Sequence, residues 1–218
     1  PPAPWSAVEA ELNMALPGGW RAHFQSIAEQ PAGAASIAQV HKAVALDGRP
    51  VALKLLRPGV ERQFQQALAS YAWAAERLER LGGEFERLKP RVVIETFRQW
   101  TMAELDLRRE AGNASELAEA VRGAPKIRVP AVVWEQTTRR TLAMEWVDGV
   151  KLTDRAAVAA TGADRKRLAA ALVRGFLAQA IGSGFFHADL HQGNILLTAD
   201  GELVLIDFGI MGRLDRRA

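Results

Sequence analysis

The sequence has no cysteine, which excludes disulfide bonds and thiolate metal sites within its 218 residues. It also has no run of 18 or more uncharged apolar residues, so it predicts no transmembrane helix. The opening segment, PPAPWSAVEAEL, lacks the basic region and apolar run of a signal peptide, and it lacks an initiator methionine. Together with the ending LDRRA, these features lead us to expect a piece of a longer protein.

The sequence also has little excess of either charge, because the formal net charge is only +3. The sequence pI of about 9.6 reflects a slight basic excess that is spread along the chain, so we do not expect nucleic-acid binding. Apolar residues make up 49% of the chain and charged residues 24%, which is ordinary for a globular protein with a sizeable core.

Hydrophobic spacing and turn residues predict the order of the elements. The first part is predicted to hold helices over 5–16 and 20–29, a strand pair over 36–46 and 51–56, and long helices over 60–81 and 90–121. The second part is predicted to hold strands over 131–136 and 141–147, a helix over 164–182, and a hairpin made by ILLT and LVLID. This order predicts an α+β fold. We expect an N-terminal helical extension (1–30), a sheet-bearing lobe (31–147) and part of a helical second lobe (148–218).

The segment FFHADLHQGNILL, residues 185–197, concentrates polar side chains between two apolar runs. One interpretation is a metal site built on His187, Asp189 and His191. A loop position before Gly193, and the lack of a further His or Cys cluster, argue against it. A second interpretation is phosphoryl transfer, and a third is a polar loop without chemistry.

The segment LIDFGIMG, residues 205–212, favours phosphoryl transfer. A His-x-Asp-x-x-x-x-Asn loop, a hairpin and then Asp-Phe-Gly is the arrangement by which kinase-like folds gather oxygen ligands at a nucleotide phosphate. Magnesium prefers such hard oxygen donors. We therefore expect Asn194 and Asp207 to hold the metal and Asp189 to accept or orient the proton of the nucleophile.

Lys54 lies inside the apolar strand VALKLL, and only six of the 28 basic residues are lysines. A lone buried ammonium is costly, so Lys54 needs a partner or a task, unless it reaches water from an edge strand. The segment ELDLRREAGN, residues 104–113, supplies acids for such a role. We expect Glu104 to pair with Lys54 and to fix its ammonium against the nucleotide phosphates. The alternative is a solvated helix face with salt bridges.

The small-residue loop PAGAASIAQVH, residues 31–41, comes one strand before Lys54. Small side chains let backbone amides approach a phosphate closely, although the same composition also suits a tight hairpin. The loop residues predicted to contact a nucleotide are Ala32, Gly33, Ala34, Ala35, Ser36, Ile37, Ala38, Gln39 and Val40.

Together these stretches resemble the UbiB or aarF-domain family of atypical kinases, with the closest likeness to its bacterial ubiquinone-biosynthesis branch. The shared elements are the Ala-rich loop, the VA-x-K strand, the E-x-D helix that ends in EAxN, the HADLH-x-GN loop and Asp-Phe-Gly. They cover residues 31–214. The resemblance implies a protein-kinase-like two-lobe fold that is truncated within the C-terminal lobe. It also implies binding of ATP and magnesium, with Lys54, Glu104 and Asp189 as catalytic residues.

The resemblance further places Glu145 and Val147 at the strand exit that contacts adenine. It implies a role in ubiquinone biosynthesis at the cytoplasmic face of the bacterial inner membrane. Prenylated quinone precursors and ubiquinone-biosynthesis proteins would then be partners, and the longer parent would associate with the membrane. The sequence departs from the family at Gly33 and Gln192, and it lacks the K-x-G-Q element.

Two other functions remain open at this point. Small-molecule phosphotransferases of the aminoglycoside or choline kinase type share an H-x-D-L-H-x-x-N loop that is followed by an Asp. A non-catalytic ATP-binding scaffold of a quinone-synthesis complex would keep the nucleotide motifs without turnover.

Overall fold

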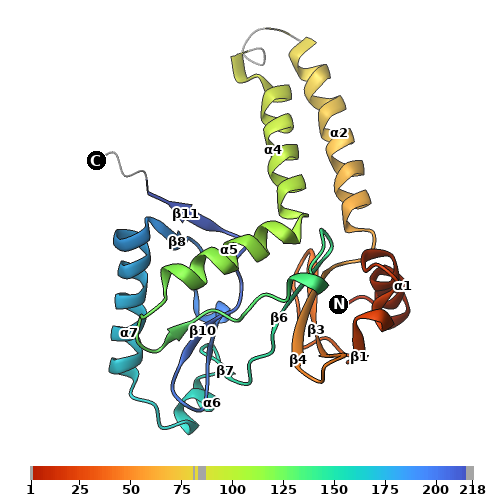
Figure 1. The fold of residues 1–218 in the computed structure, drawn as a ribbon. Coiled ribbons are helices and arrows are strands. Elements are labelled where there is room, and N and C mark those ends of the chain that lie inside the picture. The colour runs from red at the N-terminus through yellow and green to blue at the C-terminus, as the bar shows by residue number, and fades with distance from the viewer. Residues whose placement is uncertain (1, 81, 83–86, 215–218) are drawn as a thin grey trace.

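The N-terminal part of the chain folds around an antiparallel sheet in a computed structural model that describes residues 2–80, 82 and 87–214 (Figure 1). Strands β1 (Phe24–Ile27), β3 (Ala38–Ala45), β4 (Pro50–Leu56) and β6 (Thr141–Glu145) follow in that spatial order, and β2 (Gly33–Ala34) pairs with β3. The predicted hairpin is confirmed: β3 and β4 pair through seven residues, with Val40 opposite Lys54. Along β4, residues 51, 53 and 55 are buried, whereas 52 and 54 are partly exposed.

The helix predicted over 5–16 is confirmed as α1 (Trp5–Ala15), which covers one face of this sheet. Residues 20–29 were expected to be helical, and this prediction is wrong. A 3₁₀ turn (Trp20–Ala22) leads into β1, which pairs with the edge of β3. Phe24 and Ile27 are buried in the core beneath α1, so sheet pairing and burial override the local helical spacing.

Helices α2 (Val60–Arg80) and α4 (Pro90–Glu104) form a long hairpin that projects away from the sheets (Figure 1). The start of α2 agrees with the prediction; residue 81, where its end was expected, lies outside the described residues. A single helix over 90–121 was also predicted, and here the structure differs. The helix breaks at Leu105 and resumes as α5 (Leu107–Ala120), because Asp106 adopts an extended backbone and caps the new helix.

The rest of the chain builds a second sheet in the order β5 (Ile127–Arg128), β10 (Leu203–Leu205), β9 (Ile195–Leu197) and β7 (Val150–Lys151). The predicted hairpin of β9 and β10 is confirmed. Strand β8 (Phe185–His187) pairs separately with β11 (Met211–Arg213). Helices α6 (Arg155–Ala160) and α7 (Arg165–Leu177) lie beside the second sheet, and α7 continues into a π-helical segment (Ala178–Ser183).

Residues 131–136 were predicted to form a strand, and this prediction is wrong. The described backbone makes one isolated bridge, from Val132 to Met144, and a 3₁₀ turn, Trp134–Gln136. Val133 N–H still bonds to Ala143 O, so the segment runs along β6 without becoming a full strand.

One hydrophobic core joins the two sheets through α5. Leu56 from β4, Leu117 from α5, Leu142 from β6 and Leu205 from β10 are all fully buried in it, together with Phe208. Helix α5 buries Leu107, Glu110, Ala111, Ala114 and Leu117, so its buried face includes one charged residue, Glu110. The predicted α+β class is confirmed. No helix within the described ranges is long and apolar enough to span a membrane.

Candidate functional site

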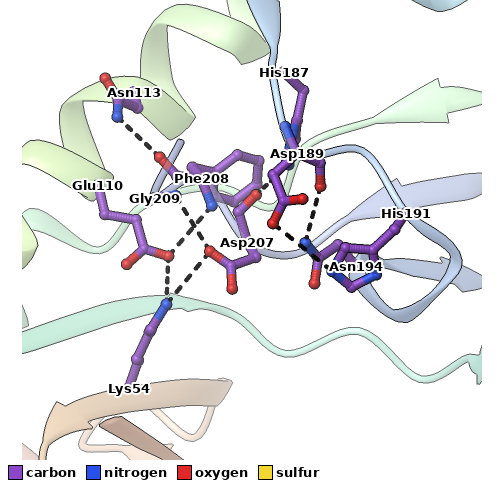
Figure 2. Close-up of polar contacts among 10 residues, drawn as sticks. All are labelled: Lys54, Glu110, Asn113, His187, Asp189, His191, Asn194, Asp207, Phe208 and Gly209. Atoms are coloured by element: carbon purple, nitrogen blue, oxygen red, sulfur yellow. Dashed lines mark hydrogen bonds and ion pairs between the residues drawn. The ribbon is translucent and has the colours of Figure 1, made fainter. Parts of the chain in front are cut away.

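Lys54 on β4 meets two carboxylates that come from distant parts of the chain (Figure 2). Its Nζ lies 2.6 Å from Glu110 Oε1 and 3.6 Å from Asp207 Oδ1. The side chains of Lys54 and Glu110 are only 15% and 7% exposed, whereas that of Asp207 is 45% exposed. Lys54 therefore has the partner that a buried ammonium requires, and the more exposed Asp207 keeps an open side.

Burial and charge compete in this cluster. Burial lowers the pKa of Lys54, but Glu110 and Asp207 outweigh it, so its pKa is raised and the ammonium stays charged. Burial raises the pKa of Glu110, with a contribution from Asp207, and Lys54 opposes this rise. We take the contact as an ion pair, because at 2.6 Å the Nζ also donates a hydrogen bond to Glu110 Oε1.

The predicted pairing of Lys54 with Glu104 is wrong. Glu104 is exposed at the end of α4, on the far side of the break at Leu105 from Glu110. The break redirects the chain, so the acid that reaches Lys54 comes from α5. A sequence signal for Glu110 existed. Leu107, Glu110, Ala111, Ala114 and Leu117 form one buried helix face, and Glu110 is its only charged member.

Asn113 and Phe208 are two further contributors that the sequence reasoning did not single out. Glu110 Oε1 accepts a hydrogen bond from Phe208 N–H, and Asn113 Nδ2 donates to Phe208 O (Figure 2). Phe208 itself is fully buried in the core. Helix α5 thus holds both sides of the residue after Asp207, which fixes the backbone from which that carboxylate projects.

The loop after β8 is organised by His187. Its Nε2 is 2.5 Å from Asp207 O, and its Nδ1 accepts from Asp189 N–H. His187 thereby joins the Asp189 loop to the Asp207 segment. The alternative metal triad is not assembled among the described residues, because both ring nitrogens of His187 are engaged within the protein.

Asn194 and Asp207 present oxygen donors of the kind that magnesium prefers. Asn194 Nδ2 donates to Asp189 O, which leaves Asn194 Oδ1 available (Figure 2). Asp207 accepts from Gly209 N–H and retains an exposed second oxygen. This donor set fits a magnesium ion that is also held by phosphate oxygens. Across the described part of the chain, no group of three or more His, Asp or Glu side chains could by itself hold a metal.

Two cavities meet at Lys54, Asn194 and Asp207. The first, here called the hinge cavity, has a volume of about 470 Å³ and extends to Met144 and Val147. The second, here called the acid cavity, has a volume of about 620 Å³. Its charged and polar lining residues are Ser36, Lys54, Glu104, Asp106, Arg109, Glu110, Asn113, His187, Asp189, Asn194, Asp207 and Arg213.

The predicted nucleotide loop divides between these cavities. Ala32, Gly33, Ala34 and Val40 line the hinge cavity, Ser36 and Ile37 line the acid cavity, and Ala35 and Ala38 line both. Gln39 is the exception, and the structure corrects its prediction. Its buried side chain lies on the opposite face of β3, where it contacts Ala3 and His41, because side chains alternate along a strand.

Glu145 and Val147 both line the hinge cavity at the exit of β6. The Glu145 carboxylate is 2.9 Å from Arg128 Nη1, so its charge is directed to β5. Ala52 and Leu196 line the same cavity from opposite sheets. The hinge cavity therefore lies between the two sheets.

The known proteins that this chain resembles are kinase-like proteins. The model of the ABC1 atypical kinase-like domain matches residues 1–218. A "Probable protein kinase UbiB" from Xanthomonas euvesicatoria is 40% identical over 220 residues, which covers 96% of this chain and 39% of that protein. One from Xylella fastidiosa is 35% identical over 218 residues, covering 97% of this chain and again 39% of the relative. This chain thus spans well under half the length of those curated relatives.

Two solved structures share the fold. The Rv3197–erythromycin complex from Mycobacterium tuberculosis has a TM-score of 0.73 and 32% identity, and the match covers 98% of this chain and 53% of that one. A Rio2 kinase–ADP/Mg²⁺-phosphoaspartate complex from Chaetomium thermophilum has a TM-score of 0.54 and 18% identity, covering 89% and 50% of the two chains. The predicted protein-kinase-like fold is confirmed. With its full length matched by the family model, this chain belongs to the ABC1 atypical kinase-like domain family, and it is similar to UbiB proteins.

Proposed function

We propose that this chain binds ATP with magnesium and acts as a UbiB-type phosphotransferase or ATPase. The observation that carries the proposal is the contact of Lys54 with Glu110 and Asp207 where the two cavities meet. A charged lysine beside a metal-binding carboxylate suits a polyphosphate that runs from one cavity to the other.

In this proposal the hinge cavity takes the adenosine. Backbone groups of β6 near Glu145 and Val147 contact the adenine, and the small residues at 32–35 let the loop approach the phosphates. Lys54 binds phosphate oxygens, while Asn194 and Asp207 would hold the magnesium. When bound, the ion would neutralise charge that develops on the transferred phosphoryl group.

Asp189 lines the acid cavity and not the hinge cavity. An acceptor hydroxyl or water in the acid cavity would therefore have its proton accepted or oriented by Asp189. His187 helps to fix the position of Asp189, because its Nδ1 accepts a hydrogen bond from Asp189 N–H. Glu104 lines the same cavity from α4, and we propose that it acts on the acceptor side rather than on Lys54.

The two-lobe division is also a proposal, with a seam near Val147–Gly149. Its support is that β6 pairs with β4 in the first sheet, whereas β7 pairs with β9 in the second. The proposed biological role is to support ubiquinone biosynthesis at the cytoplasmic face of the inner membrane, with prenylated quinone precursors and ubiquinone-biosynthesis proteins as partners. That role rests on the family resemblance.

The test is ATP hydrolysis by the full-length protein with magnesium, with and without anionic liposomes and a prenylphenol, beside Asp207→Asn. We expect the substitution to abolish turnover and magnesium-dependent nucleotide binding, because a formal charge leaves the metal site. Calorimetric titration with and without magnesium measures the binding. Magnesium dependence that survives in Asp207→Asn would contradict the assignment of Asp207.

Binding without turnover under every condition would favour the scaffold alternative. Phosphorylation of a choline or aminoglycoside panel, without stimulation by the prenylphenol, would favour the small-molecule kinase alternative.

A further inference from the structure

The acid cavity contains one arginine that its surroundings leave unengaged. Helix α5 turns Asp106, Arg109, Glu110 and Asn113 toward this cavity, at the three- and four-residue spacing of a single helix face. Three of these four have partners: Asp106 binds Arg108, Glu110 binds Lys54, and Asn113 binds Phe208 O. Arg109 is exposed, and its guanidinium has no ion-pair or hydrogen-bond partner among the residues that the structure describes.

The position of Arg109 in the helix is unfavourable for a cation that has no partner. It lies in the first turn of α5, where the helix dipole disfavours a cation. The neighbouring Arg108 is stabilised there by two contacts to the Asp106 carboxylate. Arg109 has no such compensation, so fold stability does not explain a guanidinium at this point.

The two cavities differ in which charges they present. The lysines that line the hinge cavity are Lys54 and Lys151, and Arg109 is not part of its lining. Arg109 instead shares the acid cavity with Asp189. The other arginine of that cavity, Arg213, is paired with Glu116 at 2.6 Å. Arg109 is therefore the free guanidinium on the acceptor side of the described site.

We propose that Arg109 recognises an anionic group, a carboxylate or a phosphate monoester, on the phosphoryl acceptor. This inference rests on the proposed function, because it takes the acid cavity as the acceptor side. A planar guanidinium matches both anions through two parallel N–H···O bonds. Binding the anion at Arg109 would place the rest of the acceptor within the same cavity as Asp189.

Glu104 lines the same cavity, and its carboxylate has no ion-pair or hydrogen-bond partner among the described residues. An anion near Arg109 would be repelled by Glu104, so removing that charge should strengthen anion binding. Arg109→Ala and Glu104→Gln therefore shift the affinity for an anion in opposite directions, which a general loosening of the cavity would not do.

The experiment is calorimetric titration of the full-length protein, saturated with magnesium and a non-hydrolysable ATP analogue, with benzoate and with inorganic phosphate. The analogue fills the γ-phosphate position, so a bound anion reports the acceptor side. Benzyl alcohol is the neutral counterpart of benzoate, and Arg165→Ala on α7 removes an exposed arginine that lies outside both cavities.

We expect Arg109→Ala to weaken anion binding about ten- to hundredfold, Arg109→Lys to weaken it less, and Arg165→Ala to leave it unchanged. Glu104→Gln should tighten it severalfold. Stronger binding of benzoate indicates a carboxylate acceptor, and stronger binding of phosphate indicates a phosphorylated one. The melting temperature of each variant shows whether it remains folded.

The proposal is overturned if Arg109→Ala binds the anions as the wild type does, if the wild type binds neither anion, or if benzyl alcohol binds as tightly as benzoate. Nucleotide saturation is measured separately beforehand. If the analogue does not bind, the proposed function fails, and the anion titrations on the nucleotide-free protein still test Arg109.

Discussion

The buried pair of Lys54 and Glu110 is the residue-scale feature on which the candidate site depends. Each charge is desolvated, and each compensates the other at 2.6 Å. Removing one partner of a buried pair leaves an uncompensated charge, which typically costs about 3–5 kcal/mol. Removing both costs much less than the sum of the two single changes.

A double-mutant cycle tests this pairing. With Lys54→Met and Glu110→Gln, we expect a coupling of about 1–3 kcal/mol in the free energy of unfolding, measured by urea titration. Lys54→Met combined with Glu104→Gln should be additive within about 0.5 kcal/mol, because the structure does not join those side chains. Coupling to Glu104 in place of Glu110 would contradict the observed arrangement.

At the scale of elements, the break between α4 and α5 determines which acid enters the site. Leu105 and Leu107 are both buried, so the corner is anchored by the core on each side of Asp106. The Asp106 carboxylate accepts from Arg108 N–H and from its guanidinium. The corner therefore combines a helix cap with an ion pair.

We expect Asp106→Ala to destabilise the fold by about 1 kcal/mol, since the cap is lost, and Asp106→Asn to cost less, since an amide still caps.

The hydrogen bond from the Arg108 side chain holds the pKa of Asp106 below its usual value. The stabilisation is therefore complete above the unfolded-state pKa of about 3.9 and is lost as the pH falls through the lower folded-state pKa. Urea titrations of wild type and Asp106→Ala across that acidic range measure it; a difference that stays undiminished at the lowest pH would contradict an ionic contribution.

The connection into the second sheet supplies another element-scale test. A Cβ added to Gly149 would lie 3.0 Å from Leu197 O and 3.2 Å from Leu196 Cβ. We expect Gly149→Ala to destabilise by about 1–2 kcal/mol, because the β9 backbone cannot move away easily. Gly112→Ala is the control: it lies within α5 with open space around it, and it should stabilise by up to about 1 kcal/mol. Thermal unfolding measures the stability of both variants. A Gly149→Ala variant as stable as the wild type would mean that β7 can shift.

At the scale of the whole molecule, a buried hydrogen-bond chain joins the N-terminal segment to the first sheet. Ala3 N–H donates to Gln39 Oε1, the Gln39 amide bonds to His41 Nε2, and His41 Nδ1 bonds to Ala28 O. If His41 Nδ1–H donates to Ala28 O, then its Nε2 accepts from Gln39. Neutral His41 satisfies this chain, whereas the protonated ring would present a second donor to the Gln39 amide.

Burial lowers the pKa of His41, and its hydrogen bond to Ala28 only partly opposes this. The stabilisation from neutral His41 is therefore complete above the unfolded-state pKa of about 6.5 and declines as the pH falls toward the lower folded-state value. We expect the free energy of unfolding to fall more steeply with decreasing pH in wild type than in His41→Phe. Guanidinium titrations at a series of pH values measure both slopes; equal slopes would show that His41 does not contribute.

The sequence was most informative where a position is constrained locally. The Asp189 loop, the hairpin after it and Asp207 were predicted, because turn residues, alternating strands and motif spacing act over short distances. The β3–β4 hairpin with Lys54 followed for the same reason. The first strand was missed because β1 forms only through pairing with β3, a contact that local spacing does not record.

Composition and local pattern by themselves determined that this is an α+β protein with a Lys strand, a His-x-Asp-x-x-x-x-Asn loop and Asp-Phe-Gly. Only the tertiary structure decided which side chains meet. Glu104 and Glu110 are both acids near one helix corner, and the turn at Asp106 brings Glu110 rather than Glu104 to Lys54. Gln39 likewise faces away from the cavities, through strand alternation and core packing. Sequence spacing limits which contacts are possible, but a change of chain direction and the burial of a face select among them.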